Sequence, residues 1–174
     1  MDDAEISDSI RQTLATAVER LRTADAHDEA LAIFIPRRRL LLFTKEASFI
    51  PLGRVWRLGV FLLDREETLY QTGSTTRAVA PGHPGFQSNS AEERRGHRAA
   101  AFKGPFSPGE TVNFGANVID LDAEALRISH GPLFLADDKP LVRWNPTATV
   151  DTAIPFDAYL AERVSLLVEP PAGA

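Results

Sequence analysis

The chain has 174 residues, the length of one domain, and its 44% apolar and 25% charged residues are the balance of a globular protein. This composition excludes a disordered or collagen-like chain, and no apolar run approaches the roughly 20 residues that a membrane span needs. The net charge of -5 argues against a nucleic-acid binder, which usually presents a basic face. The absence of cysteine excludes disulfides and thiolate catalysis.

The N-terminal segment is predicted to form an amphipathic helix over residues 7–24. Ile10, Leu14 and Leu21 recur at the spacing of one helical face. Ser7 or Ser9 can cap the first turn, because a serine hydroxyl accepts a hydrogen bond from a free backbone N–H there.

Three apolar runs follow, at 30–35, 39–45 and 55–63, and each predicts a strand. Pro36 and the arginines after it indicate a hairpin turn between the first two, because proline cannot donate to a strand ladder. The third run is apolar on both faces, which is typical of a central strand covered on both sides. A second layer of the fold, or a second copy of the chain, is expected to provide that cover.

Two shorter strands are predicted at 68–72 and 75–80, across a turn at Gly73 and Ser74. A further strand is predicted near 111–114.

A loop at 81–90 leads into a predicted helix over 91–102. Ser90 and Glu93 have the capping-box spacing, which places the start of the helix directly after the serine.

The last third of the chain is predicted to be an antiparallel meander closed by a helix over 156–168, where Phe156, Leu160 and Val164 share one face. The expected strands are 126–129, 133–136 and 141–144, with turns at 130–132 and 137–140.

These elements predict one α+β domain over residues 1–174, with a frayed tail from about residue 170. The sheet is expected to be rich in antiparallel pairs and able to curl into a half-barrel. N- and C-terminal helices flank it, and one helix near 91–102 is inserted. A homodimer is expected, because the apolar strands need cover and Trp56 or Trp144 can anchor an interface.

Polar side chains gather over residues 77–117, in contrast to the alternating pattern of the rest of the chain. Long loops in compact domains often carry function, because the scaffold presents them without needing them for packing. We therefore predict that this segment binds a small polar molecule. The expected ligand-binding residues are Arg77, His83, Gln87, Asn89, Arg98 and Asn113. For the cluster at 113–117 that holds Asn113, a turn or bulge that ends a strand is the competing interpretation.

Glu93 and His97 are candidates for catalysis, since helical spacing of four residues places them on one face. His97 would act as a general base oriented by Glu93, in a hydrolase acting on a small polar metabolite. A salt-bridged, solvated helix face is the alternative interpretation of the same pair. His83 could complete a metal set with them, but only one ligand pair has supporting spacing, so no metal is predicted.

An anion site at the start of the 91–102 helix is a further alternative, because free backbone N–H groups lie there and Arg77, Arg94 and Arg98 could add bidentate contacts. Glu92 and Glu93 oppose it by their charge.

No P-loop, dinucleotide-binding, nucleophile-elbow or Ser-x-x-Lys pattern occurs in the sequence. Three functions therefore remain open: binding of a small polar ligand without catalysis, a hydrolase with the Glu93 and His97 pair, and a structural protein-interaction module. The last predicts a conspicuous apolar surface patch. No nucleic-acid or membrane partner is expected, and the absence of a signal-peptide pattern predicts a cytoplasmic protein.

Overall fold

The computed structural model describes residues 2–39, 41–82, 88–145 and 147–170. The chain folds as two compact units, each built from separate stretches of sequence. Unit 1 comprises Met1–Asp28, Trp56–Thr72 and Asn117–Ala174, and unit 2 comprises Glu29–Val55 and Gly73–Ala116.

A mixed sheet and four described α-helices confirm the predicted α+β class. The strands of this sheet are β1 (Glu29–Ile35), β4 (Ser48–Leu58), β5 (Phe61–Leu63), β6 (Leu69–Gln71), β7 (Ser74–Arg77), β8 (Thr111–Phe114) and β9 (Asn117–Val118). Their hydrogen-bonded order is β7-β8-β1-β4-β5-β6-β9, and the pair β1 and β8 is parallel while the other pairs are antiparallel. The described strands form an open sheet that does not close into a barrel.

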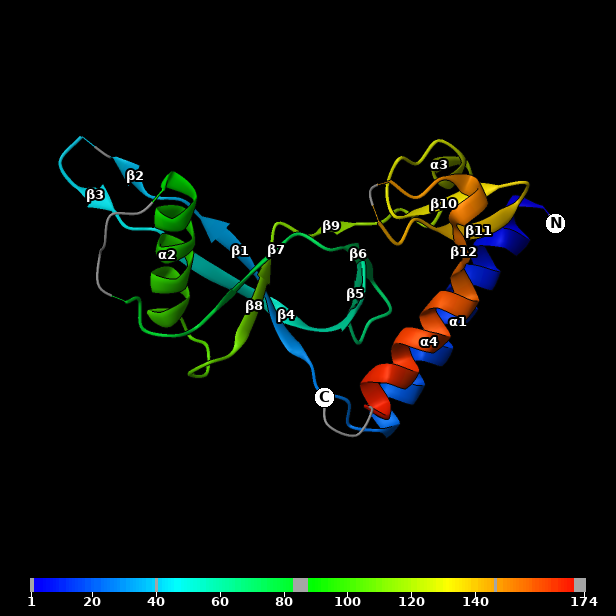
Figure 1. Ribbon diagram of the computed structural model, residues 1–174, viewed down its shortest axis with the longest axis horizontal. Helices are drawn as coiled ribbons and strands as arrows, with labels where there is room; N and C mark the ends of the chain where they lie inside the picture. The colour runs from blue at the N-terminus through cyan, green and yellow to red at the C-terminus, as the bar shows by residue number, and fades with distance from the viewer. Residues whose placement is uncertain (1, 40, 83–87, 146, 171–174) are drawn as a thin grey trace. The chain divides into compact units, whose positions relative to one another are not determined.

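Unit 1 is built on two long helices, α1 (Asp3–Thr23) and α4 (Phe156–Val168), which pack side by side (Figure 1). The α4 helix has the predicted bounds. The elements of unit 1 outside the mixed sheet also include β10 (Leu133–Ala136), β11 (Lys139–Val142), β12 (Ile154–Pro155), α3 (Ala123–Arg127) and a short 3-10 turn at Val150–Thr152. The core of the unit joins both long helices to the β4–β5 region through side chains such as Leu14, Phe61 and Phe156.

The start of α1 lies four residues before the predicted position. Asp2 caps it: its carboxylate accepts from the Glu5 N–H at 2.8 Å, and the Asp2 N–H donates to the Glu5 carboxylate at 2.9 Å. Ser7 is buried inside the helix and Ser9 lies in it as well, so the prediction of either serine as the cap is wrong. The carboxylates of Asp2, Asp3 and Glu5 also lie at the positive end of the helix dipole, where negative charge is stabilising.

The predicted single strand over 55–63 is in fact the hairpin of β4 and β5. The chain turns at Gly59, whose φ of 67° lies in the left-handed region, and the Val60 N–H donates to the Tyr159 hydroxyl at 3.1 Å. Trp56 then lies opposite Leu63 in the ladder. The run is continuously apolar because it folds back on itself within a core, so it supplies no argument for a partner subunit.

Unit 2 has β1 at its centre, between β4 and β8. The predicted hairpin between 30–35 and 39–45 is wrong, because β2 (Arg38–Arg39) and β3 (Thr44–Lys45) pair with each other instead. Together they form a separate small hairpin beyond the end of β1 (Figure 1). The 68–72 and 75–80 strands also form, as β6 and β7, but β6 pairs with β5 and β9 and β7 with β8, so no hairpin joins them across Gly73 and Ser74.

The inserted helix α2 (Asn89–Phe102) confirms the helix predicted over 91–102, and it packs against β7. Ser88 is its N-cap residue and makes no side-chain capping bond. Ser90 lies within the helix, so the predicted capping box with Glu93 is wrong. Beneath α2 lies a core of small and aromatic side chains: Ala30, Ala32, Phe49, Ala78, Ala100, Ala101, Val112 and Phe114.

The predicted strand at 126–129 is wrong, since α3 occupies this part of the chain. Asp122 starts the helix by accepting hydrogen bonds from the N–H groups of Glu124 at 2.9 Å and Ala125 at 3.4 Å. The predicted hairpin is confirmed as β10 and β11, but its second strand begins at Lys139 and not at residue 141, because Asp137 and Asp138, both at positive φ, complete the turn. Over the described part of the chain, no helix is both long and apolar enough to cross a membrane.

Candidate functional site

Asn113, a predicted ligand-binding residue, lies inside β8 and is only 1% exposed. Its side-chain amide donates to the Glu29 carboxylate at 2.7 Å and to the Ala30 carbonyl at 3.1 Å. These bonds tie β8 to the start of β1. Asn113 itself lies within the strand, and the turn interpretation of this cluster is confirmed just after it, since β8 ends at Phe114 and Gly115 has a φ of 66°.

Arg77 also has partners within unit 2. Its Nε and Nη2 both donate to the Gly109 carbonyl, at 3.2 and 3.1 Å. Asn89 and Arg98 lie exposed on α2, while His83 and Gln87 fall outside the described residues. Binding of a small polar ligand by this set stays a prediction.

His97 packs among aromatic rings. Its ring centroid lies 4.5 Å from that of Phe34, edge to face, and 4.8 Å from that of Phe114. Glu93 is exposed, and no hydrogen bond between Glu93 and His97 is present in the described structure. The contacts of His97 are those of a packing residue, and its role as a general base stays a prediction. Within the described ranges, no three His, Cys, Asp or Glu side chains come together as a metal site.

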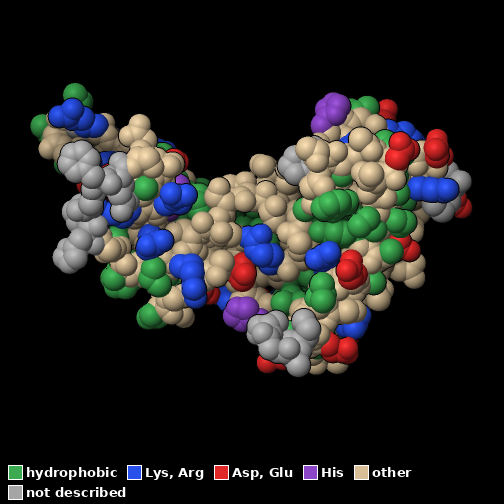
Figure 2. Space-filling view, viewed as in Figure 1, with side chains coloured by type: hydrophobic (Ala, Val, Ile, Leu, Met, Phe, Trp, Pro, Cys, Tyr) green, Lys and Arg blue, Asp and Glu red, His purple; other side chains and the backbone are tan. Residues whose placement is uncertain are grey.

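The two units carry opposite charge. Unit 2 holds ten Lys and Arg against five Asp and Glu, a net charge of +5, whereas unit 1 holds nine against nineteen, a net charge of -10. The total of -5 hides this division. Figure 2 shows Lys and Arg side chains gathered in the region of α2 in unit 2. Charge counts along the chain could have revealed the difference only with the boundaries of the units known, because unit 2 is made of two separate segments.

The strongest surface anomaly is the tip of the β2–β3 hairpin, which we call the apolar tip: Leu41, Leu42 and Phe43. Their exposed fractions are 105%, 93% and 64%. Basic residues lie on the strands beneath, where Arg38 opposes Lys45 in the ladder. Three adjacent large apolar side chains exposed to water are costly, and contiguous apolar patches on a surface are a general feature of interaction sites.

Apolar exposure continues on the sheet of unit 2. Ile33 of β1 and Ile50 of β4 lie opposite each other in the ladder, and both are about half exposed. Leu52, beside the β-bulge in the β1–β4 ladder, is exposed as well. Exposed apolar side chains in unit 2 are therefore not limited to the apolar tip.

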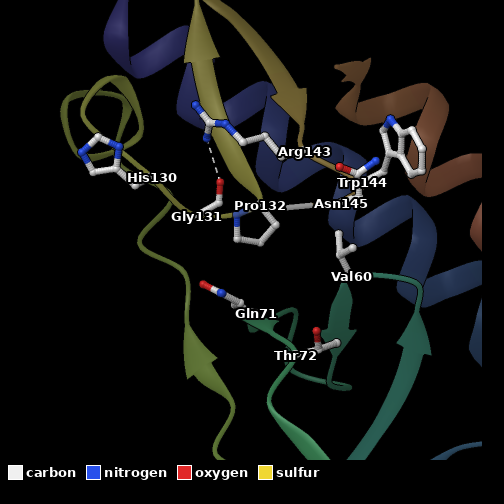
Figure 3. A pocket seen from close by; sticks show the side chains of 9 residues that line it. All are labelled: Val60, Gln71, Thr72, His130, Gly131, Pro132, Arg143, Trp144 and Asn145. Atoms are coloured by element: carbon white, nitrogen blue, oxygen red, sulfur yellow. Dashed lines mark hydrogen bonds between the residues drawn. The ribbon is translucent and has the colours of Figure 1, made fainter. Parts of the chain in front are cut away.

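Unit 1 contains a solvent-open hollow of about 420 Å³ (Figure 3). Val60, Gln71 and Thr72 form one side of it. Its opposite side comes from the loop at His130–Pro132 and from Arg143–Asn145, after β11. None of these residues belongs to the predicted 77–117 segment, and they come from four separate stretches of the chain, so no pattern along the sequence could have assembled them.

Comparisons with models of protein families, with curated proteins and with solved structures find no match to this chain.

Proposed function

We propose that this chain is a protein-interaction module that uses the apolar tip of unit 2 to associate with a second copy of itself. The observation that carries the proposal is the exposure of three adjacent apolar residues, Leu41, Leu42 and Phe43, next to basic strands. We choose a second copy of this chain as the partner because the charges of its two units are known. Its unit 1, at a net charge of -10, complements the net +5 of unit 2.

The energetics indicate a weak, reversible contact. Burying a large apolar side chain contributes about 1.5–3 kcal/mol, so the three residues of the tip contribute on the order of 6 kcal/mol. Association costs on the order of 4–15 kcal/mol in lost translation and rotation, so the tip alone offsets this cost only at the low end of the range. Attraction between the basic and acidic units supplies the remainder, so the affinity should be micromolar or weaker and should fall with salt.

The contact joins different surfaces of the two copies, and it is therefore head-to-tail. Such contacts close into rings where the geometry permits and otherwise grow with concentration. The average mass in solution is expected to increase as the protein concentration is raised through the micromolar range.

Sedimentation velocity over the micromolar range, at low and at moderate salt, tests the proposal. The wild-type protein should associate at low salt, and the Leu41→Ser/Leu42→Ser variant should remain monomeric. Phe102→Ser is the control, because Phe102 is an exposed apolar residue of unit 2 that lies outside the apolar tip. This control should associate like the wild type.

A wild-type protein that stays monomeric at low salt would refute self-association, as would association that the double variant leaves unchanged. Vesicles containing phosphatidylserine provide a second arm. If monomeric wild type bound them and the double variant did not, the tip would be assigned to a lipid surface and the proposal would be wrong.

A further inference from the structure

The hollow of unit 1 differs in charge from the unit that holds it. Unit 1 carries nineteen carboxylates, yet none of them lines the hollow. The charged or titratable side chains at its surface are Arg143 and His130. A volume of about 420 Å³ is within the usual range of sites for small molecules.

Arg143 is held in place before any ligand arrives. Its guanidinium carbon lies 3.6 Å from the centroid of the Phe134 ring, and its Nη1 donates to the carbonyls of Gly131 at 2.8 Å and Ser129 at 3.3 Å. Among the described residues, its Nε–H and Nη2 hydrogens have no hydrogen-bond partner. A fixed guanidinium with unused donors is suited to an anion, since little side-chain freedom is lost on binding.

Further polar side chains surround this cation. The side chains of Gln71, Thr72 and His130 make no hydrogen bond within the described structure, and Figure 3 shows them bordering the same hollow as Arg143. The Asn145 side-chain oxygen accepts from Thr147, at 2.8 Å from both its backbone nitrogen and its hydroxyl, which leaves the Asn145 NH₂ as a donor. Donors therefore outnumber fixed acceptors around the hollow.

The remaining wall is apolar and flat. Trp144 is 49% exposed, and its indole N–H donates to the Thr152 carbonyl at 3.2 Å, which orients the ring. Val60 and Pro132 add aliphatic surface. A ring held in this way can stack against a planar group.

We propose that this hollow binds a small anion, a carboxylate or phosphate attached to a flat apolar body, with Arg143 holding the charge and Trp144 contacting the ring. The site is independent of the apolar tip, since all of its residues belong to unit 1.

Titrations followed by amide and indole NMR test this assignment, with benzoate, phenyl phosphate and neutral benzyl alcohol as probes. The chain has two tryptophans, and the buried Trp56 serves as an internal control. The Trp144 indole signal, assigned with Trp144→Phe, should shift saturably with at least one anion and remain still with the alcohol. The anion that binds more tightly distinguishes a carboxylate ligand from a phosphate ligand.

Two variants locate the binding. Arg143→Gln should weaken it about tenfold or more, because the charged hydrogen bonds are lost. Gly131→Leu should abolish binding by filling the hollow while the protein stays folded, since a Cβ there meets only ordinary contacts, at 3.4 Å from Ser129 Oγ and 3.5 Å from Gln71 Oε1. Equal shifts with benzyl alcohol, no saturable shift with either anion, or unchanged binding in Gly131→Leu would each overturn the proposal.

Discussion

Replacing Gly59 by alanine tests the β4–β5 turn on which unit 1 depends. Gly59 has a φ of 67°, a conformation that costs an L-residue about 1–2 kcal/mol. A Cβ at this position would overlap the hydroxyl oxygen of Tyr159, and it would lie 3.1 Å from the Tyr159 Cζ. The tyrosine ring must therefore move for the variant to fold.

The cost of that movement follows from the hydrogen bond that it breaks. The Tyr159 hydroxyl accepts from the Val60 N–H at 3.1 Å, and an orphaned, partly buried donor costs about 1–3 kcal/mol. With the backbone strain, Gly59→Ala should destabilise the protein by about 3 kcal/mol. For a chain of this size, that corresponds to a fall in Tm of about 6–12 °C.

Calorimetry and urea unfolding of a double-mutant cycle measure this effect. Tyr159→Phe removes the overlapping oxygen, so Gly59→Ala should cost less in that background than in the wild type. Gly109→Ala is the control for backbone strain, because Gly109 has a φ of 80° and open space where the Cβ would stand. Equal losses for Gly59→Ala and Gly109→Ala, together with an additive cycle, would refute the assigned role of the Tyr159 contact.

Three further predictions concern stability. Gly96→Ala should raise the free energy of unfolding by up to about 1 kcal/mol, measured by urea unfolding, because Gly96 lies inside α2 with nothing near its Cβ position. Burial and the hydrogen bond to Asp64 raise the pKa of Tyr70 above 10.0. The unfolded chain therefore loses this proton at lower pH than the folded chain, and stability should fall above about pH 10. In Tyr70→Phe, urea midpoints measured against pH should lose the part of this fall that comes from Tyr70. The hydrogen bond from Arg127 lowers the pKa of Asp3 below 3.8. The stabilisation by the Asp3 carboxylate is therefore present above pH 3.8 and is lost as the pH falls through the pKa of Asp3 in the folded protein. Asp3→Asn should reduce the loss of stability at acidic pH, and an unchanged loss would contradict the pairing.

The elements that sequence reasoning placed well are those specified by nearby residues. The α4 helix has a strong apolar period that starts beside Pro155, and its bounds were predicted to the residue. The β10–β11 hairpin follows from Asp137 and Asp138, since aspartate tolerates positive φ. The predicted start of α1 was wrong because Asp2, and not Ser7 or Ser9, caps the helix, and all three residue types can accept the capping hydrogen bond.

The candidate site was predictable only in part. The polar character of residues 77–117 is real, but Arg77 and Asn113 form hydrogen bonds within unit 2 that link segments far apart in the chain. The hollow of unit 1 collects Gln71, His130 and Arg143 from segments with no shared pattern. Residues that meet only through tertiary structure leave no periodic signal in a single sequence.

By itself, the sequence determined the α+β class, the terminal helices and several turns, because periodicity and turn chemistry act over a few residues. The tertiary structure decided which strands pair and which apolar residues are buried. Leu41–Phe43 and Phe61–Leu63 are equally apolar triplets, yet the first is exposed on a hairpin tip and the second has no exposed surface. Burial depends on the neighbours that distant segments supply, and those neighbours are chosen by the packing of the whole chain.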